Sequence, residues 1–272
     1  MAPDLSFGPQ GDQWYYTRDT RTYDLTRGND QGGSETQFTL ATTQGPTDTS
    51  VTIDPAKSAL VVVDMQNYFL DAQCRDYPAG LATVEPLLKV IEKCREVGVQ
   101  VVWLNWGLRE IDLPVLPASV QRSFSRSLID PSHAPLRHGL GADLGDGKGR
   151  TLMAGAWNAE IYGPLASAGA VRPGDAQCAK NRMSGLWSES QPLCRHIEDN
   201  DTRTLFFAGV NTDQCVLSTL TDAYNQGWDC VMIEDCCAST TPNGQSVCLW
   251  NVANSYGFVV DSKSFTGGTL TR

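Results

Sequence analysis

The chain has 272 residues, of which 41% are hydrophobic and 19% charged, and this composition is typical of globular proteins. Its 21 Lys and Arg residues against 31 Asp and Glu residues give a net charge of −10, which argues against binding to nucleic acid or an anionic membrane surface. No apolar run approaches the roughly 20 residues that span a bilayer, and the N-terminus lacks the basic and apolar regions of a signal peptide.

Residues 1–56 differ from the rest of the chain. They are rich in Asp, Thr, Gln, Gly and Arg, and they carry an aromatic cluster of Trp14, Tyr15, Tyr16 and Tyr23. Disordered tails are usually poor in aromatic residues, so we expect an ordered N-terminal arm. It either packs on the surface of the main domain, which we favour, or reaches a neighbouring subunit or covers a pocket.

From residue 57 onward, apolar strands alternate with amphipathic helices. Residues 58–63 (SALVVV) form a continuous apolar run, as in a strand buried on both faces. The helix that follows has apolar side chains at helical spacing from Val84 to Ile91 and ends at Gly98. The same patterns predict strands at 99–104, 175–180, 203–208, 228–233 and 258–260, helices at 118–128, 216–226 and 247–256, and a Gly-rich loop at 136–150.

This alternation predicts an α/β fold. We expect residues 57–272 to form a three-layer, Rossmann-like domain with a mainly parallel sheet of about six strands and helices on both faces, preceded by the arm at 1–56. In such sheets the functional groups lie at the carboxyl ends of the strands. Those strand ends are therefore the place to search for a site.

Polar groups follow four of the predicted strands. Asp64 follows the first strand, Asn105 the second and Lys180 the third, while the turn at 209–214 leads to Cys215 at the start of a helix. An acid, an amine and a thiol are thus expected to meet at one edge of the sheet. Each alone has an ordinary explanation as a helix cap, a surface charge or a core residue, so the prediction depends on their joint placement.

These three groups together suit nucleophilic catalysis. A free thiol has a pKa near 8.5, and the N-terminal end of a helix favours its thiolate. Asp64 can accept the thiol proton and return it to a leaving group, while Lys180 keeps Asp64 ionised. Backbone N–H groups at the start of the Cys215 helix are free to bind an oxyanion.

Cysteine and histidine usage narrows the chemistry further. The nine cysteines are an odd number and include no C-x-x-C pair, which favours free thiols in a reducing compartment and hence a cytoplasmic protein. The three histidines, His133, His138 and His196, have no metal-binding spacing. We therefore expect neither a catalytic metal nor a cofactor. The Gly-rich stretch GLGADLGDGKGR fits neither a Walker motif nor a dinucleotide fingerprint, which argues against a nucleotide-dependent oxidoreductase.

Three stretches resemble the motif regions of the isochorismatase-like cysteine hydrolases, and the resemblance covers about residues 57–265. They are VVVDMQNYF, GDAQCAKNRMSGLW and AGVNTDQCVLSTLTDAYNQGWDCVMIEDC. The resemblance implies that Asp64, Lys180 and Cys215 form a catalytic triad. It also implies a cis peptide bond between Val210 and Asn211, with the backbone amides of Asn211 and Cys215 lining an oxyanion hole.

Departures from the family's patterns narrow the activity. Members that cleave isochorismate lack the nucleophilic cysteine, so Cys215 argues against that reaction. The region after the second strand reads LNWGLREIDLP and lacks the Asp and paired His by which nicotinamidases hold a metal. The nearest resemblance is to the ureidoacrylate amidohydrolases, through VVWLNWG, LMAGAWNAEIYGPL and VRPGD.

That resemblance predicts a hydrolase that cleaves a C–N bond of a small ureido, carbamoyl or amide compound through a thioester. Related subgroups act on N-carbamoyl amino acids or biuret, and a catalytically inactive binding protein with the same fold is an alternative of another class. Members of the family usually form dimers or tetramers, so we expect a homo-oligomer. The substrate-binding residues that we expect are Asn105, Trp157, Tyr68, Trp106 and Trp187; for Trp157, packing under the Gly-rich loop is an equal alternative.

Overall fold

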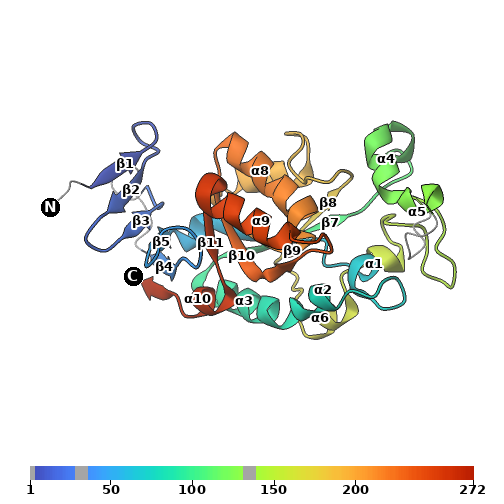
Figure 1. Ribbon diagram of the computed structural model, residues 1–272, viewed down its shortest axis with the longest axis horizontal. Coiled ribbons are helices and arrows are strands. Elements are labelled where there is room, and N and C mark those ends of the chain that lie inside the picture. Colours follow the sequence, from blue (N-terminus) through green and yellow to red (C-terminus); the bar gives the residue numbers. More distant parts are fainter. Residues whose placement is uncertain (1–3, 28–35, 131–138) are drawn as a thin grey trace.

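The computed structural model describes residues 4–27, 36–130 and 139–272. Its centre is a six-stranded sheet in which every neighbouring pair of strands is parallel (Figure 1). The strands are, in spatial order, β11 (Phe258–Val260), β10 (Asp229–Ala238), β9 (Thr204–Val210), β6 (Ser58–Val63), β7 (Gln100–Trp106) and β8 (Ala176–Lys180).

Strand β6 lies in the middle of this sheet, and all six of its residues are buried. In its register, Val61 pairs with Phe207 of β9 on one side and with Val102 of β7 on the other. The uninterrupted apolar sequence of β6 follows from this position, because helices cover both faces and neither face meets water.

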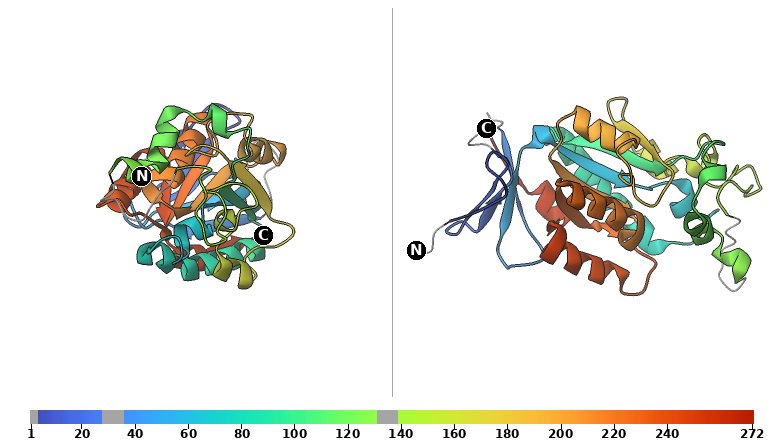
Figure 2. Two further views of the ribbon diagram at one scale, coloured as in Figure 1. Left: turned by 90° about the vertical axis from the view of Figure 1, so that its right-hand side faces the viewer. Right: turned by 90° about the horizontal axis from the view of Figure 1, so that it is seen from above.

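The helices form one layer on each side of the sheet (Figures 1 and 2). The chain moves from β6 to β7 to β8 in one direction across the sheet and from β8 through β9 to β11 in the other, so right-handed crossovers place the connecting helices on opposite faces. The first layer contains α3 (Val84–Val97), α6 (Gly163–Ser167) and α10 (Ser262–Thr266), and the second contains α7 (Pro192–Asp199), α8 (Leu217–Gln226) and α9 (Gly244–Asn251). This arrangement confirms the predicted three-layer α/β fold.

Two predicted helices are interrupted. The helix expected at 118–128 consists of α4 (Ala118–Phe124) and α5 (Arg126–Ile129), separated by Ser125 in a non-helical conformation. The helix expected at 247–256 begins as α9 and continues as a π-helical turn over Val252–Tyr256.

Short helices α1 (Asn67–Leu70) and α2 (Pro78–Ala82) follow β6. Among the described residues, no helix has the length and apolar character needed to cross a membrane.

The N-terminal segment forms a second sheet, which the sequence patterns did not predict. Its order is β1-β2-β3-β5-β4-β12, and the last strand comes from the C-terminus of the chain (Figure 2). Leu270 of β12 pairs with Phe38 of β4. The strands are β1 (Leu5–Phe7), β2 (Trp14–Thr17), β3 (Thr22–Asp24), β4 (Gln37–Ala41), β5 (Ser50–Ile53) and β12 (Thr269–Thr271).

A buried polar cluster joins the second sheet to the parallel sheet. Asp229, the first residue of β10, accepts hydrogen bonds from Trp14 Nε1 and Arg27 Nη2, each at 2.8 Å, and from Thr204 Oγ1 at 3.1 Å. Burial raises the pKa of Asp229, and the adjacent Arg27 guanidinium opposes that shift. Because both charged side chains are almost fully buried, each needs the other to remain charged there.

Candidate active site

Asp64 is the residue at which the chain leaves the central strand. It has a left-handed conformation, with φ of 54°, and its backbone amide still donates to the carbonyl of Leu104 at 2.9 Å. Its carboxylate accepts a hydrogen bond from the Trp106 backbone amide at 3.2 Å and pairs with Lys180 Nζ at 2.9 Å. The acid is therefore fixed by the end of the neighbouring strand β7 and by the last residue of β8.

Lys180 is fully buried, and its ammonium group has a defined set of partners. Besides Asp64, Nζ donates to the carbonyl oxygens of Arg182 and Met183, at 3.2 and 3.1 Å. The ring of Trp106 covers the same ammonium, with its centroid 4.2 Å from Nζ. Two carbonyl hydrogen bonds, an ion pair and an aromatic ring thus surround the ammonium, which is how a buried charge avoids a large desolvation cost.

Cys215 lies in a π-helical turn, Thr212–Val216, immediately before α8. The thiol is within hydrogen-bonding reach of the Asp64 carboxyl group and lies 3.3 Å from Met183 Sδ. Burial, reinforced by the negative charge of Asp64, raises the pKa of Cys215 to about 12, against the opposing influence of Lys180. Burial and the neighbouring carboxylate thus favour the neutral thiol, whereas Lys180 and a helix N-terminus favour the thiolate.

The ionisation of Asp64 is also shifted by its surroundings. Burial raises the pKa of this carboxyl group, whereas the charge of Lys180 and hydrogen bonds from Cys215 and Trp106 oppose the shift. Three ionisable groups that follow three different strands thus lie next to one another. The structure brings together Asp64, Lys180 and Cys215, although Asp64 lies more than a hundred residues before the other two in the sequence.

The segment before Cys215 is shaped by a close approach between strands. Gly209, near the end of β9, has φ of 118°, and a Cβ there would lie 2.0 Å from the carbonyl oxygen of Val63. The following Val210–Asn211 peptide bond is cis. The carbonyl of Asn211 accepts from the amides of Gln214 and Val216, at 3.1 and 3.3 Å, so the turn around the cysteine is held by its own backbone.

An aromatic group lies beside the acid and the ammonium. Tyr68 of α1 is buried and contacts Phe124 at a centroid distance of 6.4 Å, while Trp106 contacts Phe124 at 5.0 Å. Trp106 Nε1 is buried beside the Cys215 sulfur, where its N–H lowers the pKa of the thiol. Of the expected substrate-binding residues, Trp106 contacts Asp64 and Lys180 directly. The rings of Tyr68 and Trp106 both pack against Phe124.

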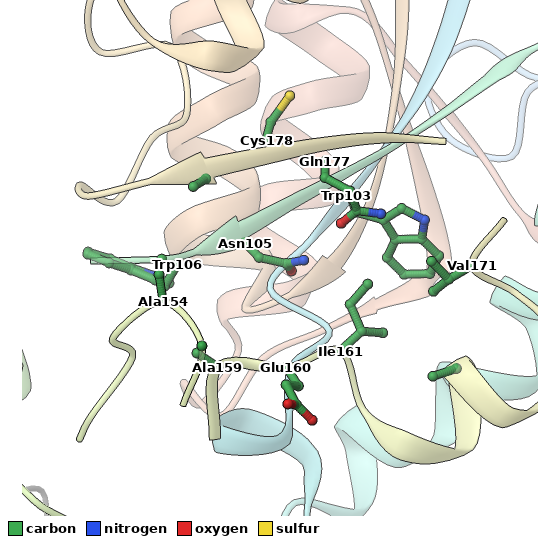
Figure 3. Close-up of a pocket in the computed structure, with 14 residues that line it drawn as sticks. Trp103, Asn105, Trp106, Ala154, Ala159, Glu160, Ile161, Val171, Gln177 and Cys178 are labelled. Carbon is green, nitrogen blue, oxygen red and sulfur yellow. The ribbon is translucent and has the colours of Figure 1, made fainter. Parts of the chain in front are cut away.

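Asn105 lies on the other face of the sheet. Along β7, side chains alternate between faces, and the register pairs Trp106 with Lys180 but Asn105 with Ala179. Asn105 lines a cavity of about 580 Å³ bounded by β7, β8 and the segment 154–171 (Figure 3). Trp106, whose ring covers the Lys180 ammonium, lines the same cavity.

Two further expected residues have separate surroundings. Trp157 is half-buried, and its carbonyl accepts a hydrogen bond from Asn67 Nδ2 at 2.9 Å. Trp187 is 44% exposed and stacks with the guanidinium of Arg182, 4.8 Å from the ring centroid. Within the described part of the chain, no hydrogen bond or ring contact joins Trp157 or Trp187 to Asp64, Lys180 or Cys215.

Gln66 is a site residue that the sequence reasoning missed. Its Oε1 accepts from the Trp106 backbone amide at 3.0 Å, and its Nε2 donates to the carbonyls of Trp106 and Ala159, at 2.7 and 2.6 Å. This fully buried side chain links the end of β7 to the segment that contains Ala159. The signal in the sequence that could have identified Gln66 is a polar residue two positions after Asp64, close to the end of a buried strand.

The described residues contain no group of three or more His, Cys, Asp or Glu side chains placed to hold a metal ion. His133 and His138 lie outside the described residues, as does the start of the predicted loop at 136–150. His196 lies on α7, where its Nε2 is 2.9 Å from Gln100 Oε1.

The fold and this site define a parallel α/β protein with a buried acid, ammonium and thiol at adjoining strand ends. Comparison with protein families identifies an isochorismatase domain at residues 58–264. The chain belongs to the isochorismatase family, whose members are hydrolases.

Among curated proteins, the ureidoacrylate amidohydrolases RutB of Cronobacter sakazakii and Cronobacter turicensis are each 29% identical over 224 residues, covering 79% of this chain and 90% of the relative. A cysteine hydrolase from Pseudomonas syringae shares the fold, with a TM-score of 0.63 and 18% identity over 83% of this chain and 95% of its own. N-carbamoylsarcosine amidase from Thermoplasma acidophilum matches with a TM-score of 0.55 and 25% identity over 76% of this chain and 96% of its own.

Proposed function

We propose that this protein is a cysteine amidohydrolase that cleaves a C–N bond of a small ureido, carbamoyl or amide compound. Cys215 is the nucleophile, Asp64 transfers protons, and Lys180 keeps Asp64 available as a carboxylate. The observation that supports the proposal most strongly is the fully buried Asp64–Lys180 ion pair, 2.9 Å long, with the Cys215 thiol against its acid member.

The first half of the reaction forms an acyl-enzyme. Burial and the Asp64 charge favour the neutral thiol, so its proton passes to Asp64 as the sulfur attacks the substrate carbonyl. The tetrahedral oxyanion binds to the backbone amides of Asn211 and Cys215. When the intermediate collapses, the C–N bond breaks, the nitrogen leaves with the proton held by Asp64, and the carbonyl carbon stays bound to sulfur.

The second half releases the enzyme. Water gives a proton to Asp64 while its oxygen attacks the thioester, or the thiocarbamate where the substrate is a ureide. The C–S bond then breaks, and the proton returns from Asp64 to the sulfur. These steps use only side chains, backbone amides and water, with no metal or cofactor.

Lys180 serves as a positioning and charge-balancing group in this scheme. Without its positive charge, burial would raise the pKa of the Asp64 carboxyl group further and disfavour the carboxylate that accepts the thiol proton. The carbonyl oxygens of Arg182 and Met183 hold the ammonium in place, so it remains paired while the proton moves.

A ureidoacrylate-like substrate is the first choice, since the RutB relatives match over 79% of the chain. N-carbamoyl amino acids and biuret-type compounds are the alternatives, and the match to an N-carbamoylsarcosine amidase supports the former. We propose that Asn105, Trp106, Tyr68, Trp157 and Trp187 contribute to substrate binding.

A screen for ammonia release tests the activity. Purified protein is incubated with ureidoacrylate, N-carbamoyl amino acids, biuret and simple amides, and Cys215→Ser and Cys215→Ala variants serve as controls. We expect turnover of at least one ureide or carbamoyl compound, lost in both variants at an unchanged melting temperature. Turnover by the Cys215→Ala variant near the wild-type rate would refute the mechanism. If the wild-type protein turns over none of these compounds and Cys215 does not react with an alkylating reagent, the protein is a binding protein instead.

We also propose a cytoplasmic homo-oligomer. Light scattering coupled to size-exclusion chromatography gives the mass in solution, and a mass of a single chain at micromolar concentration would contradict this assembly.

A further inference from the structure

Thr219 places a buried hydroxyl in the helix that follows the nucleophile. It lies on α8, four residues after Cys215, and it is fully buried. The other buried side chains of α8, those of Leu220 and Ala223, are apolar. A buried hydroxyl costs free energy unless its hydrogen bonds are made, and threonine is a poorer helix residue than leucine or alanine. The partners of this hydroxyl therefore indicate why it lies there.

The hydroxyl of Thr219 bridges two parts of the proposed active site. Its Oγ1 donates to the carbonyl of Cys215 at 2.7 Å and accepts from the backbone amide of Gly185 at 3.2 Å. Because an amide N–H can only donate and a carbonyl can only accept, the two partners use both the proton and a lone pair of the hydroxyl. The helix that carries the nucleophile is thereby tied to the segment 181–185.

The segment 181–185 contacts both the ammonium and the thiol. The carbonyl oxygens of Arg182 and Met183 accept from Lys180 Nζ, at 3.2 and 3.1 Å. The sulfur of Met183 lies 3.3 Å from Cys215 Sγ. A movement of this segment would therefore move the groups that hold Lys180 and would change the surroundings of the nucleophile.

The two ends of this segment have different anchors. At its start, Asn181 Nδ2 donates to Asp112 Oδ1 at 2.8 Å, and at its end the amide of Gly185 donates to Thr219. Removal of the Thr219 hydroxyl would leave the buried Gly185 N–H without this partner. Because an unpaired buried N–H is costly, the segment would then shift to regain a hydrogen bond.

We infer that Thr219 is a positioning residue, whose hydroxyl holds the segment 181–185 and its Lys180-binding carbonyls against the backbone of Cys215. Through this tether the ammonium of Lys180 stays beside the carboxylate of Asp64. Thr219 acts on the reaction through these neighbours and not on the substrate itself. The inference rests on the proposed hydrolysis by Cys215 and extends it to a residue beyond the acid, the ammonium and the thiol.

Hydrogen exchange tests the tether without any substrate. The full chain is compared with Thr219→Val, which removes the hydroxyl, and with Thr219→Ser, which keeps it. The matched control is Thr221→Val, also on α8, where the hydroxyl donates to Ser218 O at 3.1 Å. We expect faster amide exchange over residues 181–187 in Thr219→Val and wild-type exchange there in the other two variants. Wild-type exchange over this segment in Thr219→Val would overturn the inference.

The pH profile of hydrolysis separates positioning from a purely structural role. The titratable groups that face Asp64 are Lys180 and Cys215, and a displaced Lys180 would no longer oppose the rise in the pKa of Asp64. For Thr219→Val we expect kcat to fall by about tenfold, the equivalent of roughly one hydrogen bond, with KM changed less than about twofold. The acidic limb of kcat/KM should move to higher pH, and Thr219→Ser should restore both properties.

The remaining outcomes are also decisive. A lowered melting temperature in Thr219→Val with an unshifted acidic limb would show that Thr219 only stabilises the fold, and would overturn the inference. If Thr219→Val does not fold, Thr219→Cys takes its place, because a thiol is a weak donor and acceptor, with the same direction expected for each change. A wild-type protein that hydrolyses none of the tested compounds would contradict the proposed function instead, and hydrogen exchange would still decide whether the tether exists.

Discussion

The indole ring of Trp106 lies over the ammonium of Lys180, with 4.2 Å between the ring centroid and Nζ. The same residue donates its backbone N–H to Asp64 at 3.2 Å, and its indole N–H is buried near the Cys215 sulfur. One residue at the end of β7 therefore contacts the acid through its backbone and the ammonium through its ring, and its indole lies beside the thiol.

Substitution of Trp106 separates these contacts. Trp106→Phe keeps a ring over Lys180, whereas Trp106→Leu removes the cation–π contact, which is worth about 2 kcal/mol at a desolvated site. We expect kcat/KM to fall by about tenfold or more for Leu and clearly less for Phe. Trp103→Phe, on the same strand and the opposite face, is the control. Equal losses in both Trp106 variants would show that the ring does not act through Lys180.

The activity should depend on pH through Asp64. Burial raises the pKa of this carboxyl group above its ordinary value of 3.8, and only the carboxylate accepts the thiol proton, so kcat/KM should fall as the pH drops through the raised value. Lys180→Met removes the charge that opposes this shift, so its acidic limb should move to higher pH. An acidic limb that stays in place in Lys180→Met would contradict the coupling of the two groups.

The reactivity of the thiol offers a second pH test. Because burial and Asp64 raise the pKa of Cys215 to about 12, alkylation of this residue by iodoacetamide should keep accelerating up to the highest pH at which the protein stays folded. A free cysteine would level off above about pH 8.5. Alkylation at Cys215 that reaches a plateau near neutral pH would show a stabilised thiolate instead.

Gly209 should tolerate no side chain. A Cβ there would lie 2.0 Å from the carbonyl oxygen of Val63, at the point where β9 approaches the start of the Asp64 turn. We expect Gly209→Ala to lower the free energy of unfolding by more than about 2 kcal/mol and to reduce activity in the fraction that remains folded. Gly98→Ala is the control, because Gly98 also has positive φ but open space around it, so only about 1–2 kcal/mol is expected. Urea denaturation measures both, and similar losses would exclude the steric explanation.

The buried pair of Arg27 and Asp229 should govern attachment of the second sheet. Arg27→Met leaves Asp229 buried without its charged partner, and such changes cost about 3–5 kcal/mol. The exposed pair of Lys57 and Asp201 is the control, and Lys57→Met should cost at most about 1 kcal/mol. A loss in Arg27→Met no larger than that of the control would mean that the pair does not hold the sheet.

The parallel sheet and its strand ends were predictable because strands buried on both faces appear as apolar runs in the sequence. The second sheet was not, since its strands have three to five residues and its last strand, β12, comes from the far end of the chain. Gln66 escaped because its role lies in hydrogen bonds to backbone groups of distant segments.

The covalent step tests the central mechanism most directly. The protein is mixed with a ureide or carbamoyl compound that it hydrolyses, quenched with acid during turnover, digested and examined by mass spectrometry. We predict an acyl or carbamoyl adduct confined to the peptide that contains Cys215, absent without substrate and absent in Cys215→Ser. Full turnover without any adduct on that peptide, together with activity in Cys215→Ala, would contradict the mechanism.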